Sequence, residues 1–568
     1  MARSGSGKQA RSLHPLVGAA LEQMARDQAV ERVWSLDHTL WKSHPTEIEN
    51  RLGWLTVIDR MLDEAASLRA FAASVRDSGI RDVVLLGMGG SSLGPEVLRS
   101  TFKSEKGFPR LWVLDSTVPG WVRRVTETIK PSRTLFILAS KSGGTIEVMS
   151  LFAHFWPIVS KAKGARGGSQ FIAITDPGTG LEKLAADREF WRTFSNPPDI
   201  GGRYSVLSYF GLVPAALAGI DVAQLLRRAE AMVRLCRQPA PLDENPGAYL
   251  GAAMAAYAKS GRDKVTVLTS PAVAAFGLWV EQLLAESTGK EGKGLIPIAG
   301  EPLAKPEAYG SDRFFVYVRL KGDGNGPMDT HVAALERAGQ PVVTLNLRDR
   351  FDVGAEFFRW EFATAIAGYL LHIHPFDQPN VQESKDNTAR VLRQVESSGK
   401  LPPENGLSPQ EGIAQLASHA APGRYLALLA YMTPSQEYER AMAALRKSFL
   451  SRYHVASTMG YGPRYLHSTG QLHKGGPDTG LFLQLVESMK PDVPVPGKPY
   501  TFGTLARAQA LGDLQSLQAH GRFAVRIDLG RQATTTLKKL NALLSQPPRK
   551  RPASSKSRRG STRRRPNR

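Results

Sequence analysis

Residues 82–87 form a largely apolar run that ends in a glycine-rich turn, and this feature constrains the fold more than any other. Strands buried on both faces of a sheet read as continuous runs of Val, Ile and Leu rather than as alternating patterns. Similar runs at residues 111–114, 134–139 and 171–175 are each separated by a helix-length segment. Strand and helix therefore alternate, which predicts an α/β doubly wound domain.

The same alternation begins again near Ala248, with strands expected at residues 264–268, 314–318 and 341–345. A helical link over residues 207–237 joins the two series, so we expect two stacked, flavodoxin-like parallel-sheet domains. Apolar runs further along the chain predict a C-terminal α/β extension. The expected divisions are an N-terminal tail and helix over 1–40, the first domain with preceding helices over 41–220, the second domain over 221–400, the extension over 401–545 and a disordered basic tail over 546–568.

Charge is concentrated at the C-terminus. Residues 549–568 hold ten Lys and Arg and no acid, which is about half of the net charge of +21. With Pro, Ser and Gly interspersed, this segment cannot bury enough apolar surface to fold, so we expect it to be disordered. It could attract nucleic acid non-specifically, but it lacks aromatic residues for base stacking. The positive charge left on the body suits an anionic substrate.

Several classes of protein are disfavoured by the sequence. It has no stretch of about 20 apolar residues that could span a membrane, and its N-terminus lacks the apolar core of a secretory signal. The first 20 residues are basic and favour a short disordered tail over an organelle transit segment. A single cysteine, Cys236, permits no internal disulfide and is expected as a packed helix thiol. We therefore expect a cytoplasmic protein that binds no membrane.

The turn Gly87-Met-Gly-Gly-Ser-Ser-Leu-Gly94-Pro95 follows the first expected strand and opens a helix. Backbone N–H groups at such a turn can hold an anion, and we expect Gly90 and Ser91 to contribute. A dinucleotide fingerprint fits poorly because Ser92 occupies the place of its third glycine, and a P-loop would need Gly-Lys-Ser/Thr. Taken alone, the turn could equally serve only tight packing.

A second loop, from Ser140 to Thr145, follows the expected strand 134–139 and strengthens the interpretation. Ser140, Lys141, Ser142 and Thr145 provide hydroxyls and a cation around two glycines, which can bind a phosphate dianion without a metal. Two such loops on neighbouring strands predict a phosphate site. We expect no metal and no other cofactor.

Two further motifs give the sequence its resemblance to a known family. The glucose-6-phosphate isomerase family, with two sugar-isomerase (SIS) domains, carries both loops, a Gly-Gly-Arg-Tyr/Phe-Ser signature matched at residues 201–205, and a Phe-Asp-Gln-x-Gly-Val-Glu-x-x-Lys element matched at 376–385. Asn380 and Gln382 depart from that element. These departures, and the segment 37–42, resemble the isomerase half of bifunctional transaldolase/phosphoglucose isomerase fusions.

The resemblance covers roughly residues 30–545, and beyond about residue 400 only the fusion-type branch matches. A transaldolase barrel needs about 250 residues. Fewer than 90 residues precede Gly87. We therefore expect no transaldolase half and infer no Schiff-base lysine.

The resemblance implies interconversion of glucose 6-phosphate and fructose 6-phosphate, a step of glycolysis and gluconeogenesis. Glu286, in Glu-Ser-Thr-Gly-Lys, matches the family's proton shuttle, which moves a proton between C2 and C1. Arg203 matches the fixed cation that stabilises the enediolate. Gly202 and Gln378 are expected to line the sugar phosphate.

Ring opening needs a group that exchanges a proton near neutral pH, a role suited to histidine. His331 stands where the family places such a residue, and Lys385 is expected to assist at the ring oxygen. In that family the histidine reaches the site from the partner subunit, so we expect a homodimer with His331 contributed across the interface.

Three other histidines, His454, His467 and His473, lie in a Gly/Pro-rich segment that we interpret as a loop, without a cysteine or carboxylate cluster beside them. We interpret them as surface or substrate-near residues rather than metal ligands.

Two other functions stay open at this point. An isomerase of another anionic sugar, such as mannose 6-phosphate or a sulfonated hexose, would need only a changed pocket. A non-catalytic SIS-domain sensor of sugar phosphates would bind without turnover and usually carries a helix-turn-helix, which the first 80 residues do not show.

Overall fold

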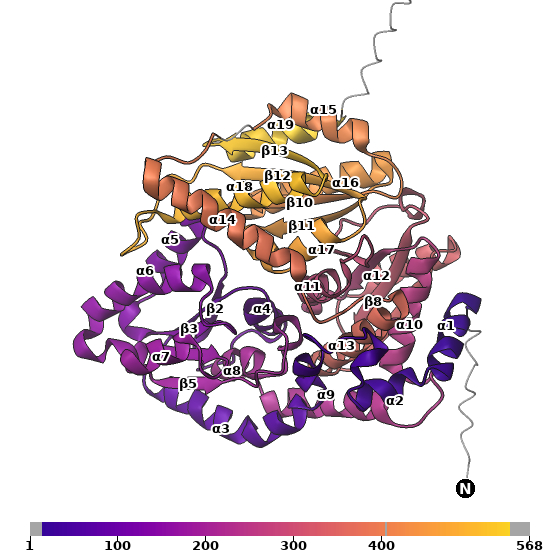
Figure 1. Ribbon diagram of the computed structural model, residues 1–568, viewed down its shortest axis with the longest axis horizontal. Helices are drawn as coiled ribbons and strands as arrows, with labels where there is room; N and C mark the ends of the chain where they lie inside the picture. The colour runs from indigo at the N-terminus through magenta and orange to yellow at the C-terminus, as the bar shows by residue number, and fades with distance from the viewer. Residues whose placement is uncertain (1–13, 404–405, 546–568) are drawn as a thin grey trace, which may run out of the picture.

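The computed structural model describes residues 14–403 and 406–545, and within them the strands form three parallel sheets (Figure 1). The first sheet contains β1 (Asp82–Gly87), β2 (Arg110–Leu114), β3 (Thr134–Ala139), β4 (Phe171–Thr175) and β5 (Arg192–Ser195). The second contains β6 (Lys264–Thr269), β7 (Ile296–Ala299), β8 (Arg313–Leu320) and β9 (Val342–Leu347). The third contains β10 (Tyr425–Tyr431), β11 (Ala456–Tyr461), β12 (Gly480–Glu487) and β13 (Phe523–Gly530). The predicted basic tail lies outside the described residues.

One strand order recurs in the three sheets. Across each sheet the order is β2-β1-β3-β4-β5, β7-β6-β8-β9 and β11-β10-β12-β13, so the earliest strand always lies between the second and the third. This is the flavodoxin-like doubly wound arrangement. The predicted α/β class with parallel sheets is confirmed, and the C-terminal extension is a third unit of the same design.

Helices surround the sheets. They are α1 (Pro15–Arg26), α2 (Ala29–Trp34), α3 (Val57–Asp77), α4 (Gly90–Phe102), α5 (Pro119–Thr128), α6 (Ile146–Lys163), α7 (Gly180–Asp187), α8 (Tyr209–Leu217), α9 (Val222–Arg237), α10 (Pro246–Lys259), α11 (Phe276–Thr288), α12 (Gly326–Arg337), α13 (Asp352–Leu371), α14 (Pro379–Ser398), α15 (Pro409–His419), α16 (Gln436–Tyr453), α17 (Gly470–Gly475), α18 (Phe502–Ala519) and α19 (Ala533–Ser545). None of these described helices is long and apolar enough to cross a bilayer. Cys236 is buried on α9, as expected for a packed thiol.

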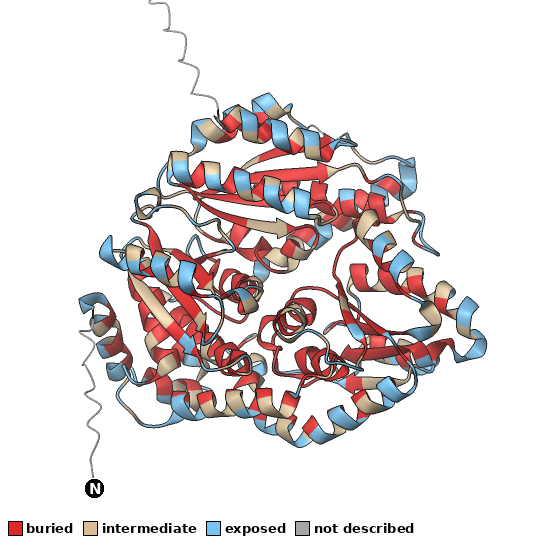
Figure 2. Cartoon of the chain, turned by 180° about the vertical axis from the view of Figure 1, so that it is seen from behind, coloured by how far each residue is buried: buried red, intermediate tan, exposed pale blue. Residues whose placement is uncertain are grey.

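The first sheet shows why its strands read as continuous apolar runs. Val83 and Leu85 of β1 belong to the core shared with α3 and α8, whereas Val84 and Leu86 belong to the core beneath α6. Because successive strand side chains point to opposite faces, a sheet covered on both faces needs apolar residues at every position. Figure 2 shows the sheets buried and the outward faces of the helices exposed.

The third unit packs in the same way, although its inner face meets the other units. Leu426 and Leu428 of β10 pack with α16 and α19, whereas Ala427 and Leu429 face α17, α18 and Ile298 of β7. The apolar run at 425–431 predicted β10 correctly. The segment 454–473, interpreted as a loop, instead contains β11, a short 3-10 helix (Arg464–His467) and most of α17. The Ala and Gly residues of β11 have little strand preference, and pairing with β10 decides the structure.

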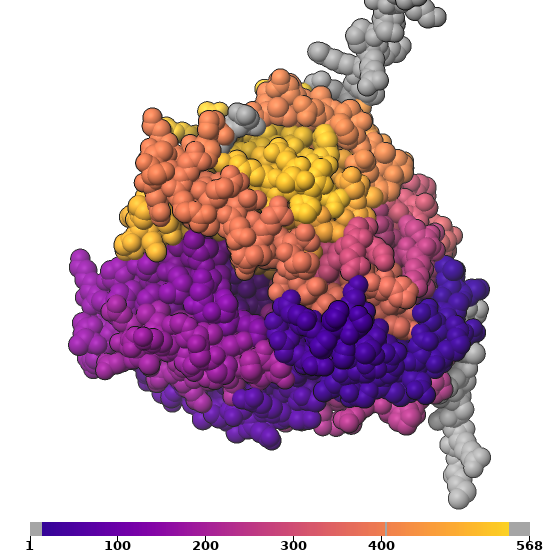
Figure 3. Space-filling view, in the orientation of Figure 1, coloured from indigo at the N-terminus to yellow at the C-terminus, as the bar shows by residue number. Residues whose placement is uncertain are grey.

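The three units meet around α11 and α17, near the middle of Figure 1. Helix α14 lies between the first and third sheets and contributes Val391 and Leu392 to the core of the first unit. Figure 3 shows a hollow on this face, where the first unit, the N-terminal helices and the segment around α14 adjoin. The junction of the units is therefore the place where distant segments converge.

Candidate active site

The glycine-rich turn after β1 packs directly against the Gly-Gly-Arg signature. A Cβ atom on Gly90 would lie 1.8 Å from the carbonyl oxygen of Gly202, so only glycine fits there. Gly89 has φ +56°, and a Cβ atom on it would lie 2.6 Å from the carbonyl oxygen of His467. Ser91 is buried in the first turn of α4. The turn thus touches both the signature and the third unit, and part of its glycine content serves close packing.

Arg203 is the centre of the first group of predicted residues. Its side chain is 2% exposed and donates from Nε to Ser287 Oγ at 2.7 Å and from Nη1 to Gln378 Oε1 at 2.9 Å. Its Nη2 donates to two backbone carbonyl oxygens of the segment 375–377. Glu286 Oε2 lies 3.7 Å from Nη1. The predicted cation and the predicted proton shuttle are therefore neighbours, and Gln378 joins them.

Lys290 was not predicted as a site residue, yet it holds this group in place. Its Nζ donates to the carbonyl oxygen of His374 and to Oδ1 of Asp377, both at 2.5 Å. Burial, with the charge of Arg203 adding to it, lowers the pKa of Lys290 to about 7. The sequence signal that could have identified Lys290 is its position at the end of the element Glu-Ser-Thr-Gly-Lys. Lys290 fixes the segment that precedes Gln378.

Gln282 connects Glu286 to the third unit. It lies one turn before Glu286 on α11, and its Nε2 donates to Glu286 Oε2 at 3.2 Å and to the carbonyl oxygen of His467 at 2.9 Å. His467 ends the 3-10 helix Arg464–His467. A residue 181 positions beyond Glu286 thus comes close to it through one amide side chain.

The second predicted loop begins at the carboxyl end of β3. Ser140 Oγ and Thr145 Oγ1 lie 2.8 Å apart, and Thr145 stands immediately before α6. Lys141 forms an ion pair with Asp176 and donates to the carbonyl oxygen of Pro198 at 2.8 Å. The loop therefore presents Ser142 and Thr145 to a cavity, while Lys141 is engaged with Asp176.

That cavity has a volume of about 420 Å³, in the range of small-molecule sites. Ser142 and Thr145 line it from the loop, Lys385 from α14, and Glu147 from the first turn of α6. The third unit contributes His467, Gln509 and Tyr500 to the same lining. Three predicted residues thus share a cavity with polar side chains that no motif indicated.

Glu147 makes polar contacts with both His467 and Gln509 in the lining of this cavity. Glu147 Oε1 lies 2.8 Å from His467 Nε2 and accepts a hydrogen bond from Gln509 Nε2 at 2.6 Å. Burial alone would raise the pKa of Glu147, but the charge and hydrogen bond of His467 and the charge of Lys385 hold it below its usual value. Glu147 is therefore an ionised partner for the imidazole.

His331 lies elsewhere in the chain. Its Nε2 is 3.3 Å from Tyr309 Oη, and it lines a different cavity together with Lys447 and His454. Burial lowers its pKa. Within one chain, His331 therefore does not join Glu286, and its expected role depends on a second subunit.

The other histidines differ from one another. His454 ends α16, with Nδ1 3.0 Å from the carbonyl oxygen of Ala308. His473 is buried, and neither ring nitrogen has a hydrogen-bond partner. The interpretation as a surface residue is confirmed for His454, which is exposed, and the interpretation is wrong for His473, which packs between Tyr465 and Phe482. Within residues 14–403 and 406–545, no group of three or more His, Cys, Asp or Glu side chains could hold a metal.

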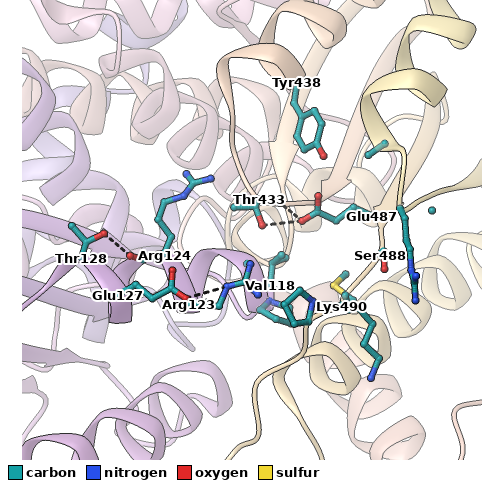
Figure 4. Close-up of a pocket in the computed structure, with 17 residues that line it drawn as sticks. Val118, Arg123, Arg124, Glu127, Thr128, Thr433, Tyr438, Glu487, Ser488 and Lys490 are labelled. Atoms are coloured by element: carbon teal, nitrogen blue, oxygen red, sulfur yellow. Dashed lines mark hydrogen bonds and ion pairs between the residues drawn. The ribbon is translucent and has the colours of Figure 1, made fainter.

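A separate cavity of about 550 Å³ lies at the carboxyl edge of the third sheet (Figure 4). Arg123 and Arg124 of α5 face it from one side, and Glu487 and Lys490, at and beyond the end of β12, face it from the other. Glu487 accepts hydrogen bonds from Thr433. None of the sequence-predicted site residues lines this cavity.

Comparison with known proteins identifies several relatives. The family model for phosphoglucose isomerase matches residues 56–294, a range that includes both predicted loops, Arg203 and Glu286. The glucose-6-phosphate isomerase of Rubrobacter xylanophilus is 33% identical over 372 residues, which cover 57% of this chain and 85% of that protein. The enzyme of the same name from Symbiobacterium thermophilum is 31% identical over 388 residues, covering 60% and 86%.

A solved structure agrees in fold. The glucose-6-phosphate isomerase of Chlamydia trachomatis superimposes with a TM-score of 0.56 at 17% sequence identity, covering 67% of this chain and 86% of that one. At this identity the likeness concerns the fold alone. Each of these matches therefore leaves part of this chain uncovered.

Proposed function

The chain belongs to the glucose-6-phosphate isomerase family, and from that membership we propose that it interconverts glucose 6-phosphate and fructose 6-phosphate. The observation that carries the proposal is the pair formed by Arg203 and Glu286, a buried guanidinium 3.7 Å from a carboxylate. An aldose–ketose isomerisation needs a base that moves a proton between C2 and C1 and a cation that stabilises the enediolate. This pair supplies both groups.

The substrate phosphate is anchored at the second loop in this proposal. Ser142 and Thr145 offer hydroxyl donors, and the start of α6 adds backbone N–H groups and the positive end of the helix dipole. Gly90, Ser91 and Gly202 lie where the first turn meets Arg203, so the sugar is expected to extend from one loop towards the other. Ser140 and Lys141 shape the second loop, through Thr145 and Asp176 respectively.

Glu286 then takes the C2 proton of the open-chain aldose and returns it to C1. Gln282 holds Oε2 of Glu286 through a hydrogen bond of 3.2 Å, which fixes the carboxylate for both transfers. The charge that develops on the enediolate is met by Arg203, whose four hydrogen bonds prevent the guanidinium from turning away. Lys385 serves at the ring oxygen. Acid–base groups suffice for this route, so it needs no cofactor.

Several finer proposals accompany the activity. We propose that the chain is most similar to the isomerase half of transaldolase/phosphoglucose isomerase fusions. The matches to the two relatives above cover only 57% and 60% of this chain, which supports a branch of the family with an additional unit. We further propose a cytoplasmic homodimer, and non-specific attraction of nucleic acid to residues 549–568. The proposed divisions at residues 40, 220, 400 and 545 place one sheet in each of the three central parts.

The test is a coupled assay of the purified full chain with fructose 6-phosphate, reading out glucose 6-phosphate. Mannose 6-phosphate and a sulfonated hexose, assayed side by side, are expected to give lower kcat/KM values. Glu286→Gln is expected to lose about 10³-fold in kcat, because it removes the base. Glu281→Gln, which alters another buried glutamate of the same helix, is the matched control.

Saturable binding of fructose 6-phosphate without turnover would instead support a sensor. A higher kcat/KM for another anionic sugar would reassign the substrate. Near-normal turnover by Glu286→Gln would show that the proton shuttle is a different residue.

A further inference from the structure

His467 has the geometry of an acid–base residue inside the cavity that holds the predicted phosphate loop. Its side chain is 17% exposed, so it is neither sealed in the core nor free in solvent. Its neighbours in the lining include Ser142, Thr145 and Lys385. A substrate anchored on the second loop would therefore occupy the same cavity as this imidazole.

The tautomer of His467 follows from its partner. An ionised carboxylate only accepts hydrogen bonds, so the short contact with Glu147 Oε1 at 2.8 Å places a proton on Nε2. The other ring nitrogen, Nδ1, has no hydrogen-bond partner among the described residues. The buried carboxylate thus fixes the ring and leaves Nδ1 as the nitrogen that can accept a proton.

His467 is also fixed relative to the proton shuttle. Its carbonyl oxygen accepts the hydrogen bond from Gln282 Nε2, the same atom that donates to Glu286. The carbonyl oxygen also lies where a Cβ atom on Gly89 would clash. These contacts fix the position of His467 relative to Glu286 and to the glycine-rich turn after β1, although His467 belongs to the third unit.

We infer that His467, supplied by the same chain as Glu286, is the base that opens the sugar ring. The inference rests on the proposed isomerisation. With glucose 6-phosphate the C1–O5 bond breaks in this step, and with fructose 6-phosphate the C2–O5 bond breaks; the electron pair goes to O5, which takes a proton from Lys385 Nζ. The electrons of the anomeric O–H bond, O1–H in the aldose and O2–H in the ketose, form the C=O double bond, and that proton passes to His467 Nδ1. Glu147 stabilises the resulting imidazolium.

One consequence is that a single chain contains every group the reaction needs. His331 of a second subunit is then not required for ring opening. A second consequence is that the third unit has a catalytic purpose, since it contributes His467 and also Gln509, which holds Glu147. Glu147 and Gln509 are positioning residues in this scheme.

The test separates ring opening from proton transfer by comparing two substrates. Fructose 6-phosphate must be opened, whereas 5-deoxyfructose 6-phosphate has no hydroxyl at C5 and stays acyclic. His467→Gln is expected to lose at least about 10²-fold in kcat on fructose 6-phosphate and to stay within about threefold of the unmodified chain on the acyclic analogue. Glu286→Gln is expected to lose activity on both.

His520→Gln is the matched control. His520 Nε2 lies 2.7 Å from Glu383 Oε2, so it forms the same kind of pair, but outside the cavity. Added imidazole is expected to restore part of the turnover of fructose 6-phosphate by His467→Ala. Such rescue would not occur if the variant had only lost its fold.

Equal losses on both substrates, or no loss on either, would overturn the assignment of His467 while leaving the isomerase function intact. Mixing His467→Gln with Glu286→Gln protein is expected to restore nothing, because both groups act within one chain. Recovery of activity in the mixture would show that the histidine acts across an interface and would overturn the inference. Failure of the unmodified chain on both substrates would refute the proposed function itself.

Discussion

Two of the cavities that lie between the third unit and the rest of the molecule contain a buried glutamate. The cavity of about 420 Å³ lies against the first unit and contains Glu147. The other, of about 270 Å³, lies against the second unit and contains Glu281, with Arg446 and Arg464 also in its lining. Glu147 is 2% exposed and Glu281 is 6% exposed. The surroundings therefore resemble each other in burial and differ in the partners they offer.

The partners give the two carboxyl groups opposite pKa shifts. Burial acts to raise both. At Glu147, His467 and Lys385 more than offset burial, and the pKa falls below its usual value. At Glu281, burial outweighs the hydrogen bond from Thr458 and the charge of Arg446, and the pKa rises to about 7. Arg446 itself donates mainly to backbone carbonyl oxygens. Burial alone therefore does not identify a catalytic carboxylate, because nearby cations also determine whether a buried carboxyl group is charged.

Glu147→Gln is expected to have the largest effect on turnover, and it tests whether the two buried glutamates differ in function. An amide of the same shape removes the anion that fixes and stabilises His467, so kcat on fructose 6-phosphate should fall on the order of 10²-fold. Turnover of the acyclic analogue should change little. Steady-state kinetics on the two substrates measures the difference.

Stability provides a second measurement on Glu147→Gln. A carboxyl group with a lowered folded-state pKa contributes stability above its unfolded pKa of about 4.5 and loses that contribution as the pH falls through the folded value. The deficit of Glu147→Gln in urea unfolding should therefore be present at pH 7 and shrink in acid. An unchanged kcat on fructose 6-phosphate would show that Glu147 has no part in positioning His467.

The opposite pH dependence is expected at Glu281. Its folded-state pKa is raised to about 7, so its contribution to stability is complete below about pH 4.5 and is lost as the pH rises through 7. A shift of this size corresponds to about 3 kcal/mol. Unfolding free energies measured between pH 5 and 8 should fall more steeply for the unmodified chain than for Glu281→Gln. Parallel curves would mean that Glu281 stays ionised in the folded protein.

The two glutamates also show what could be predicted from the sequence. Continuous apolar runs predicted seven of the nine described strands of the first two units, and the short edge strands β5 and β7 were missed. Contiguous motifs singled out Arg203 and Glu286. Glu147 and His467 belong to no motif, and 320 residues separate them. Only the docking of the third unit brings them together. Strand β11 escaped notice for a related reason, since its polar residues acquire strand structure from pairing with β10.

The smallest effect on kcat is expected from deleting residues 549–568. This deletion would sharpen the comparison by showing that neither cavity depends on these residues. The lining of the two cavities ends at Gln509 and Thr469 respectively, so kcat and KM should stay within about twofold of the full chain. The deletion removes ten positive charges out of a net +21. Retention on immobilised DNA at low salt should therefore weaken, because non-specific binding follows the number of phosphates neutralised. A large loss of kcat would place residues 549–568 in the catalytic arrangement, whereas unchanged retention would assign the DNA affinity to the cations of the folded units.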